Sequence, residues 1–223
     1  MLRELGHFLW HAPATLRLKA RLPQDALYQA LMDRADDAGL AERRAALVAD
    51  LAGDVLELGS GTGKMFEHYG AGARVAAVEP DAAFASRAEA PARAAAAEIT
   101  LHEAHGEALP FDDASFDAAV LALVLCSVPS VDAVLAEIRR VLRPGATVRL
   151  IEHVRSERPV AGWLMDRVDP LWLYLNAQGC HLNRDPLPDL ATAGLEVTRV
   201  EPFQVWSAGL PAFPMRTIHA RAR

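Results

Sequence analysis

Three glycines at alternate positions directly follow a short apolar run, and this turn is the part of the sequence best suited to bind a ligand. The run is Val55–Leu58, and residues 59–63 read Gly-Ser-Gly-Thr-Gly. Glycine has no Cβ atom, so it allows both a tight turn and the close approach of a ligand to the backbone. In open α/β sheets, ligands bind beyond the carboxyl ends of the strands. A strand that ends in this turn would place it at such a site.

The glycine spacing argues against a phosphate ligand. A phosphate-binding loop has the pattern Gly-x-x-x-x-Gly-Lys-Ser/Thr, whereas here Leu58 occupies the first glycine position and Met65 follows Lys64. The dinucleotide-binding pattern Gly-x-Gly-x-x-Gly, started at Gly59, requires a glycine where Lys64 stands. Both phosphate-binding patterns are therefore disfavoured at this turn.

Two carboxylates accompany the turn. Glu57 precedes Gly59, and a second apolar run, Val75–Val78, ends at Glu79. A carboxylate at the end of the second strand can accept hydrogen bonds from the hydroxyls of a ribose. The spacing Glu-x-Gly-x-Gly-x-Gly, followed by an acidic strand end, is typical of class I methyltransferases, whose cofactor S-adenosylmethionine carries no phosphate.

The sequence resembles the type 11 class I methyltransferases over residues 54 to 154. Two further blocks carry this resemblance: Ala104–Phe111, before the fourth apolar run, and Ile138–Gly145, before the fifth. Other blocks are similar to the small alkyl-thiol methyltransferases, and this narrower similarity covers most of residues 54 to 190. These blocks are Leu123–Val128, Glu152–Val154, Asp169–Trp172 and Gly179–Arg184.

The resemblance implies that the chain binds S-adenosylmethionine and releases S-adenosylhomocysteine. Glu57 would lie against the methionine end of the cofactor, Glu79 would hold the ribose and Leu123 would face the methyl group. Many family members carry Asp where this chain has His105, so we expect backbone contacts from the two residues that follow. The full implied cofactor set is Glu57, Gly59, Ser60, Gly61, Gly63, Glu79, Pro80, Gly106, Glu107 and Leu123.

The residues that could assist methyl transfer are histidines. The sulfonium is already activated, so the protein mainly supplies positioning and a dry environment. A thiol acceptor ionises in part unaided, whereas an alcohol needs a base. His153, at the end of the fifth run, is the best candidate base, although a structural histidine explains it equally well. His181 could also face the acceptor, and Glu152 could orient His153 or fix a backbone amide.

Cysteine and the remaining histidines give weaker signals. Cys126 lies on the most apolar run, so we expect a small buried side chain without a chemical role. His102 and His105 lack further ligands at zinc spacing, so we predict no metal site. Arg184 is expected to tie the segment around it to the sheet.

The elements that must position these residues alternate between apolar runs and helical patterns. Such alternation indicates βαβ units and a parallel sheet. The resemblance extends this to a three-layer, Rossmann-like α/β fold with a seven-stranded, mostly parallel sheet whose last strand is antiparallel. We predict one structural unit, with a helical lid over residues 1–53 and a methyltransferase domain over 54–223. A helical insertion on the substrate side is expected over about 155–193.

Composition and charge narrow the possible partners. The chain has 23 basic and 29 acidic residues, a net charge of −6, which disfavours nucleic acid as a partner. Two cysteines are too few for a disulfide framework, and no apolar run is long enough to span a membrane. We therefore expect a cytoplasmic protein, with a possible membrane contact through the N-terminal helix. The sequence does not indicate an oligomeric state.

The insertion suggests the type of methyl acceptor. It is rich in large apolar side chains, so we predict a small apolar acceptor, with a thiol favoured by the resemblance. A phospholipid or a quinone or phenol is the alternative within the same class. A nicotinamide-dependent oxidoreductase and a non-catalytic cofactor-binding subunit stay open as other classes. The residues in question are Trp163, Met165, Leu171, Trp172, Leu173 and Tyr174.

Overall fold

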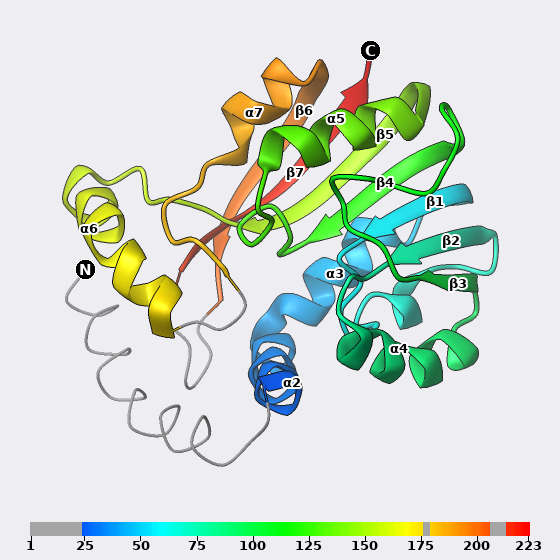
Figure 1. The fold of residues 1–223 in the computed structure, drawn as a ribbon, viewed down its shortest axis with the longest axis horizontal. Helices are drawn as coiled ribbons and strands as arrows, with labels where there is room; N and C mark the ends of the chain where they lie inside the picture. The colour runs from blue at the N-terminus through cyan, green and yellow to red at the C-terminus, as the bar shows by residue number, and fades with distance from the viewer. Residues whose placement is uncertain (1–23, 176–178, 206–212) are drawn as a thin grey trace.

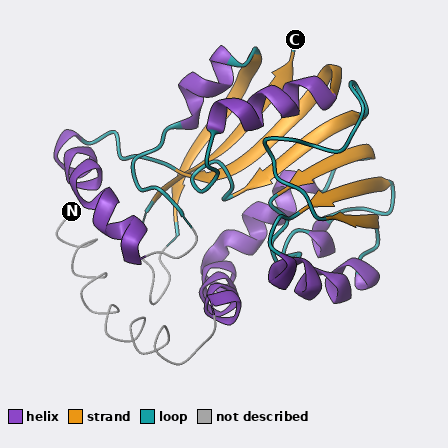
Figure 2. Cartoon of the chain, in the orientation of Figure 1, coloured by secondary structure: helices purple, strands orange, loops and turns teal. Residues whose placement is uncertain are grey.

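The computed structural model describes residues 24–175, 179–205 and 213–223, which form a seven-stranded sheet with helices on both faces (Figures 1 and 2). The strand order is β3-β2-β1-β4-β5-β7-β6. The strands are β1 (Gly53–Leu58), β2 (Ala73–Val78), β3 (Glu98–His102), β4 (Phe116–Ala122), β5 (Leu142–His153), β6 (Leu195–Gln204) and β7 (Pro214–Ala222). The predicted three-layer, Rossmann-like fold is confirmed.

Strand β7 is the antiparallel member of the sheet. The pairs β1–β2, β1–β4, β2–β3 and β4–β5 are all parallel. β7 lies between β5 and β6 and runs antiparallel to both. The first five strands therefore end at a common edge, which is where the glycine turn and the predicted catalytic residues follow their strands.

Strand β4 is shorter than its hydrophobicity indicates. The fourth apolar run of the sequence, over residues 117–125, predicts a strand that continues to Leu125, but the strand ends at Ala122. Leu123 has φ = +64°, a left-handed conformation that a side chain with a Cβ atom rarely adopts. Its amide N–H still donates to the Ile151 carbonyl at 2.7 Å. The apolar run thus continues into a loop that turns out of the sheet beside β5.

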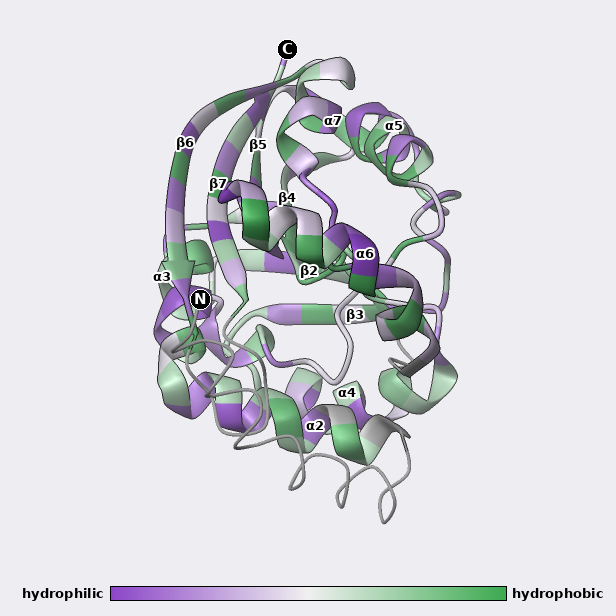
Figure 3. Cartoon of the chain, turned by 90° about the vertical axis from the view of Figure 1, so that its left-hand side faces the viewer, coloured by the Kyte–Doolittle hydropathy of each residue, from purple (hydrophilic) through white to green (hydrophobic). Residues whose placement is uncertain are grey.

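Helices cover the sheet from both sides. α5 and α7 pack on one face, and α2, α3 and α4 lie on the other (Figures 1 and 2). α5 packs an apolar stripe on the sheet, formed by Val134, Leu135, Ile138 and Val141, and its ribbon alternates between hydrophobic and hydrophilic residues (Figure 3). The helices are α2 (Gln24–Ala35), α3 (Ala41–Val48), α4 (Ala82–Ala94), α5 (Val131–Val141), α6 (Pro159–Leu175) and α7 (Pro186–Thr192).

The N-terminal helices belong to the core on one face of the sheet. Leu47 and Val48 of α3 are buried in the same cluster as Val55 of β1. α2 also reaches the glycine turn, because the Thr62 hydroxyl and the Gln29 side-chain oxygen lie 2.5 Å apart. The lid over residues 1–53 stays a prediction, and its first part, residues 1–23, lies outside the described residues.

The predicted insertion contains two helices, α6 and α7. α6 lies beyond the carboxyl end of β5 rather than on either face of the sheet (Figure 1). Three of the side chains that were predicted to line the acceptor site are mostly exposed: Trp163 at 54%, Leu171 at 58% and Tyr174 at 85%. These three therefore do not line an enclosed acceptor site. Among the described helices, none is both long and apolar enough to cross a membrane.

Candidate active site

The glycine turn adopts a backbone that only glycine accommodates easily. Gly59, Gly61 and Gly63 have φ values of +67°, +55° and +81°. A Cβ atom at position 59 would lie 2.6 Å from Cγ2 of Val124, in the loop after β4. The amides of Gly59 and Ser60 donate to the Val78 carbonyl at 2.8 and 3.1 Å. The turn is thus held against the ends of both neighbouring strands.

Glu79 connects the end of β2 to the glycine turn. Its Oε2 accepts the Gly61 amide at 2.9 Å, and its Oε1 accepts the Asp81 amide at 3.0 Å. Partial burial raises the pKa of this carboxyl group, and the two amide donors oppose the rise. Each carboxylate oxygen has a second lone pair, so Glu79 can still accept hydrogen bonds from two ligand hydroxyls.

Glu57 is a buried carboxyl group with an unused oxygen. Its side chain is 2% exposed, and Oε2 has no hydrogen-bond partner among the described residues. Burial raises its pKa to about 8, although the Tyr69 hydroxyl and the Arg44 charge lower it in part. A buried carboxyl group of this kind would gain from a cationic partner, such as the α-ammonium group of an amino-acid moiety.

We expect Glu57→Gln to remove much of the pH dependence of stability without ligand. The folded protein holds the Glu57 proton more tightly than the unfolded chain, so the free energy of unfolding falls as pH rises from about 4.5 to about 8. The shift corresponds to at most about 4–5 kcal/mol over that range. Urea unfolding at pH 5 and pH 8 measures it, with the exposed Glu67→Gln as control. An unchanged pH dependence in Glu57→Gln would contradict the buried, protonated state.

The other predicted cofactor residues lie at the same edge of the sheet. Pro80 is exposed and follows Glu79 after the end of β2. Gly106 is buried, and a Cβ atom there would lie 3.0 Å from Cδ2 of Leu58. The Glu107 carboxylate accepts the Ser130 amide at 3.3 Å, at the start of α5. Leu123 follows β4 in its left-handed conformation. Their contacts with a cofactor stay predictions.

Glu152 holds the loop that follows β4. Its Oε1 accepts the amides of Val124 and Leu125 at 3.0 and 2.9 Å, and the residue is fully buried. Burial raises its pKa to about 7, while the loop amides and the Arg184 charge oppose that rise. Of the two roles considered from the sequence, fixing backbone amides is the one present.

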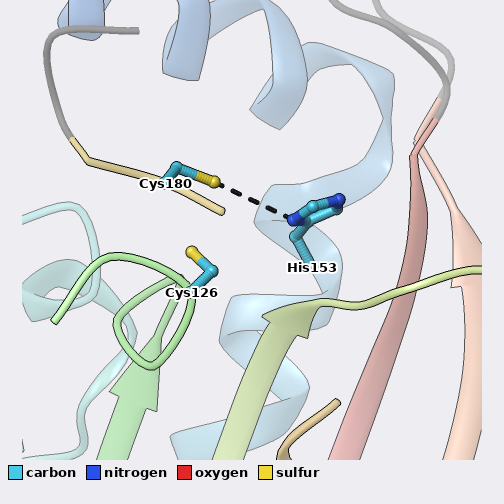
Figure 4. Close-up of side chains that lie close together, drawn as sticks. All are labelled: Cys126, His153 and Cys180. Atoms are coloured by element: carbon cyan, nitrogen blue, oxygen red, sulfur yellow. Dashed lines mark hydrogen bonds between the residues drawn. The ribbon is translucent and has the colours of Figure 1, made fainter. Parts of the chain in front are cut away.

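His153 lies beside two cysteines from distant parts of the chain. Its Nδ1 is 3.8 Å from Sγ of Cys180, its Nε2 has no partner among the described residues, and its ring centroid is 4.6 Å from that of Phe213. Cys126 completes the group, with the three potential ligand atoms all within 4.8 Å of one another (Figure 4). Sequence reasoning missed this group, because no local spacing joins residues from three separate segments.

His181 belongs to a second polar arrangement. Its Nδ1 lies 2.9 Å from Oδ2 of Asp169 in α6, whose Oδ1 accepts the Leu182 amide at 2.6 Å. The His181 amide donates to the Cys126 carbonyl at 2.7 Å. The carboxylate therefore orients the imidazole, and the backbone brings His181 to the loop after β4, on the same side of the sheet as His153.

Arg184 anchors this segment to the loop that follows β4 rather than to the sheet itself. One of its guanidinium nitrogens donates to the carbonyls of Leu125 and Val128 at 2.6 and 2.8 Å. The Arg184 carbonyl accepts the Arg155 amide at 2.8 Å. These bonds hold the segment from Gly179 to Asp185 across the end of β4 and the start of the insertion.

Comparisons with known proteins agree with this geometry. Residues 56–150 match the family model described as "Methyltransferase domain". The rat thiol S-methyltransferase TMT1B (Rattus norvegicus) is 36% identical over 152 residues, which are 66% of this chain and 62% of that protein. The human thiol S-methyltransferase TMT1A (Homo sapiens) is 33% identical over 154 residues, 67% of this chain and 63% of that protein. The chain thus matches less than two thirds of the length of these relatives.

Solved structures show the same fold. A SAM-dependent methyltransferase from Methanosarcina mazei superposes with a TM-score of 0.63 at 21% identity, covering 76% of this chain and 92% of the other. The glycine turn, β2, β4 and the second half of β1 fall within the matched family segment. Residues 56–150 are therefore similar in sequence to a methyltransferase domain, and the described part of the chain has the same Rossmann-like fold as these solved structures.

Proposed function

We propose that the protein is an S-adenosylmethionine-dependent methyltransferase whose acceptor is a small apolar thiol. The observation that carries the cofactor assignment is the glycine turn, whose Gly61 amide is bonded to the carboxylate of Glu79. The thiol assignment is supported by similarity to relatives named thiol S-methyltransferase over about two thirds of this chain.

Glu57, Gly61 and Glu79, in and beside the turn, each have a defined part in this proposal. The bound cofactor supplies a methyl group already activated by the sulfonium charge. Glu57 would bind the α-ammonium group through its unused oxygen, and Glu79 would bind the ribose hydroxyls. The missing side chain at Gly61 lets the backbone approach the ligand closely. The chain thus positions the methyl group for in-line displacement without having to generate a reactive species.

The acceptor side lies between the loop after β4 and the insertion. Phe213 contacts both His153 and Trp172, with ring centroids 4.6 and 5.5 Å apart, which gives an aromatic wall suited to an apolar acceptor. His181, oriented by Asp169, and His153 are the proposed proton acceptors for an acceptor that arrives as a neutral thiol. The roles of His153 and His181 as proton acceptors are supported by the position of both residues at the carboxyl end of the parallel strands.

The test is transfer of a labelled methyl group to a matched panel of acceptors. We expect the full chain to methylate a small alkyl thiol at least about 10-fold faster than the alcohol and the amine with the same carbon skeleton. Formation of the thioether and of S-adenosylhomocysteine in equal amounts identifies the reaction. Transfer only to the alcohol or the amine would remove the thiol assignment, and tight cofactor binding without transfer to any acceptor would favour a non-catalytic subunit.

A further inference from the structure

The cluster of Cys126, His153 and Cys180 has the geometry of a metal site. The residues come from the loop after β4, the end of β5 and the segment before α7 (Figure 4). No two of their ligand atoms are more than 4.8 Å apart, so some point lies within about 2.8 Å of all three. Zinc bonds are about 2.3 Å to sulfur and about 2.0–2.1 Å to nitrogen, so shifts of less than about 1 Å would complete the coordination.

We propose that Cys126 Sγ, Cys180 Sγ and His153 Nδ1 bind one Zn²⁺ ion and leave its fourth coordination position for the acceptor thiol. Two thiolates and one imidazole form a donor set that zinc prefers. Structural zinc sites have four protein ligands, whereas sites with three keep a position open for water or substrate. The assignment of the fourth coordination position to a thiol acceptor rests on the proposed function, whereas the binding of zinc by the three residues does not.

The backbone around the cluster is held in place before any ion binds. Glu152 fixes the two amides that precede Cys126, and the Cys126 carbonyl accepts the His181 amide at 2.7 Å. Arg184 holds the carbonyl of Leu125 and so fixes the same loop to the segment that carries Cys180. Ligands fixed in this way lose little freedom on binding an ion, which favours affinity.

The open position would explain how a thiol acceptor is activated. A thiol R–SH would bind Zn²⁺ as the thiolate and release its proton to water or to His181. The thiolate electron pair would form the new S–CH₃ bond as the sulfonium S–CH₃ bond breaks, giving the thioether and neutral S-adenosylhomocysteine. A thioether is uncharged and binds zinc more weakly than a thiolate, so the product can leave. With zinc bound, His153 is a metal ligand and no longer a proton acceptor, so His181 or water takes the proton of the thiol.

Metal content of the full chain tests the site directly. Purified without chelators under reducing conditions, the protein should contain about one zinc per chain by plasma mass spectrometry. Replacing zinc with Co²⁺ should give the sulfur-to-cobalt charge-transfer absorption of thiolate ligands. Cys126→Ala, Cys180→Ala and His153→Ala should each lower zinc content at least about 10-fold. The control His102→Gln, at the end of β3, should keep zinc.

Several outcomes would overturn the metal site. One is a zinc content well below one per chain together with no cobalt charge-transfer band. Another is an equal zinc content in the three variants and the control. A third is a disulfide between Cys126 and Cys180 that forms even when the protein is purified with a reductant. Circular dichroism and urea unfolding identify any variant that fails to fold, and Cys180→Ser, at the half-buried position, gives a milder second variant.

The experiments distinguish a failure of the zinc site from a failure of the proposed thiol methyltransferase activity. Zinc bound through the three residues in a protein that methylates only alcohols supports the site and removes the thiol assignment. Equal thiol methylation by zinc-loaded and by fully chelated, folded protein removes the zinc role and leaves the thiol assignment intact.

Discussion

Gly59→Ala should destabilise the protein by about 2–5 kcal/mol and weaken S-adenosylmethionine binding at least about 100-fold. The left-handed backbone at φ = +67° costs any residue with a Cβ atom about 1–2 kcal/mol. The new atom would also lie 2.6 Å from Cγ2 of Val124, so overpacking adds about 1–3 kcal/mol. Urea unfolding measures the stability, and calorimetric titration measures the affinity for the cofactor.

Two variants separate the causes of this effect. Gly194→Ala lies at φ = +76° with no atom within 4 Å of the added Cβ, so it should show backbone strain alone and normal cofactor affinity. Val124→Ala removes both methyl groups that the new Cβ atom would meet. The double variant Gly59→Ala/Val124→Ala should therefore be destabilised by less than the sum of the two single variants. Full cofactor affinity in Gly59→Ala would mean that the ligand binds elsewhere.

Glu79→Ala should weaken cofactor binding by about 10- to 150-fold while the fold stays intact. A hydrogen bond to a charged group is worth about 1.5–3 kcal/mol, so this range corresponds to the net loss of one of the bonds that Glu79 would make to the ribose. The variant also frees the Gly61 amide, which loosens the turn on the other side of the ligand. The measurement is the dissociation constant of S-adenosylhomocysteine, which is stable during long titrations.

A neighbouring carboxylate provides the control for Glu79. Asp81 accepts the Ala83 amide at 2.8 Å as the N-cap of α4, so Asp81→Ala should cost about 1 kcal/mol of stability. It should leave cofactor affinity nearly unchanged, because the Asp81 side chain is committed to the helix. If Glu79→Ala and Asp81→Ala lowered cofactor affinity equally, the general negative charge after β2, rather than the Glu79 carboxylate itself, would determine binding.

The architecture follows closely from the hydrophobic pattern, but the end of β4 does not. Glycine and the acidic strand ends locate the turn, and the apolar stripe of α5 predicts its buried face. The run that contains β4 is apolar to Cys126, yet the strand stops at Ala122 because the buried Glu152 carboxylate captures the following amides. That partner is 28 residues away in sequence, so local periodicity cannot reveal it.

The candidate site was predictable in its cofactor half and less so in its acceptor half. Glu57 and Glu79 lie where strand ends place them, because parallel strands bring their carboxyl ends together. Cys126 was expected to have no chemical role, and only the return of the chain at Cys180 brings it beside another thiol and His153. Loop segments obey no short sequence period, so their juxtapositions emerge only in three dimensions.

The placement of β7 has a consequence for how the molecule is assembled during synthesis. β6 is translated before β7, yet its only neighbour in the described sheet is β7, which also completes β5. Until β7 leaves the ribosome, β5 has an unpaired edge and β6 has no strand to join. Open edges of this kind promote association between chains. A nascent chain stalled before β7 should therefore depend on chaperones far more than one stalled just after it.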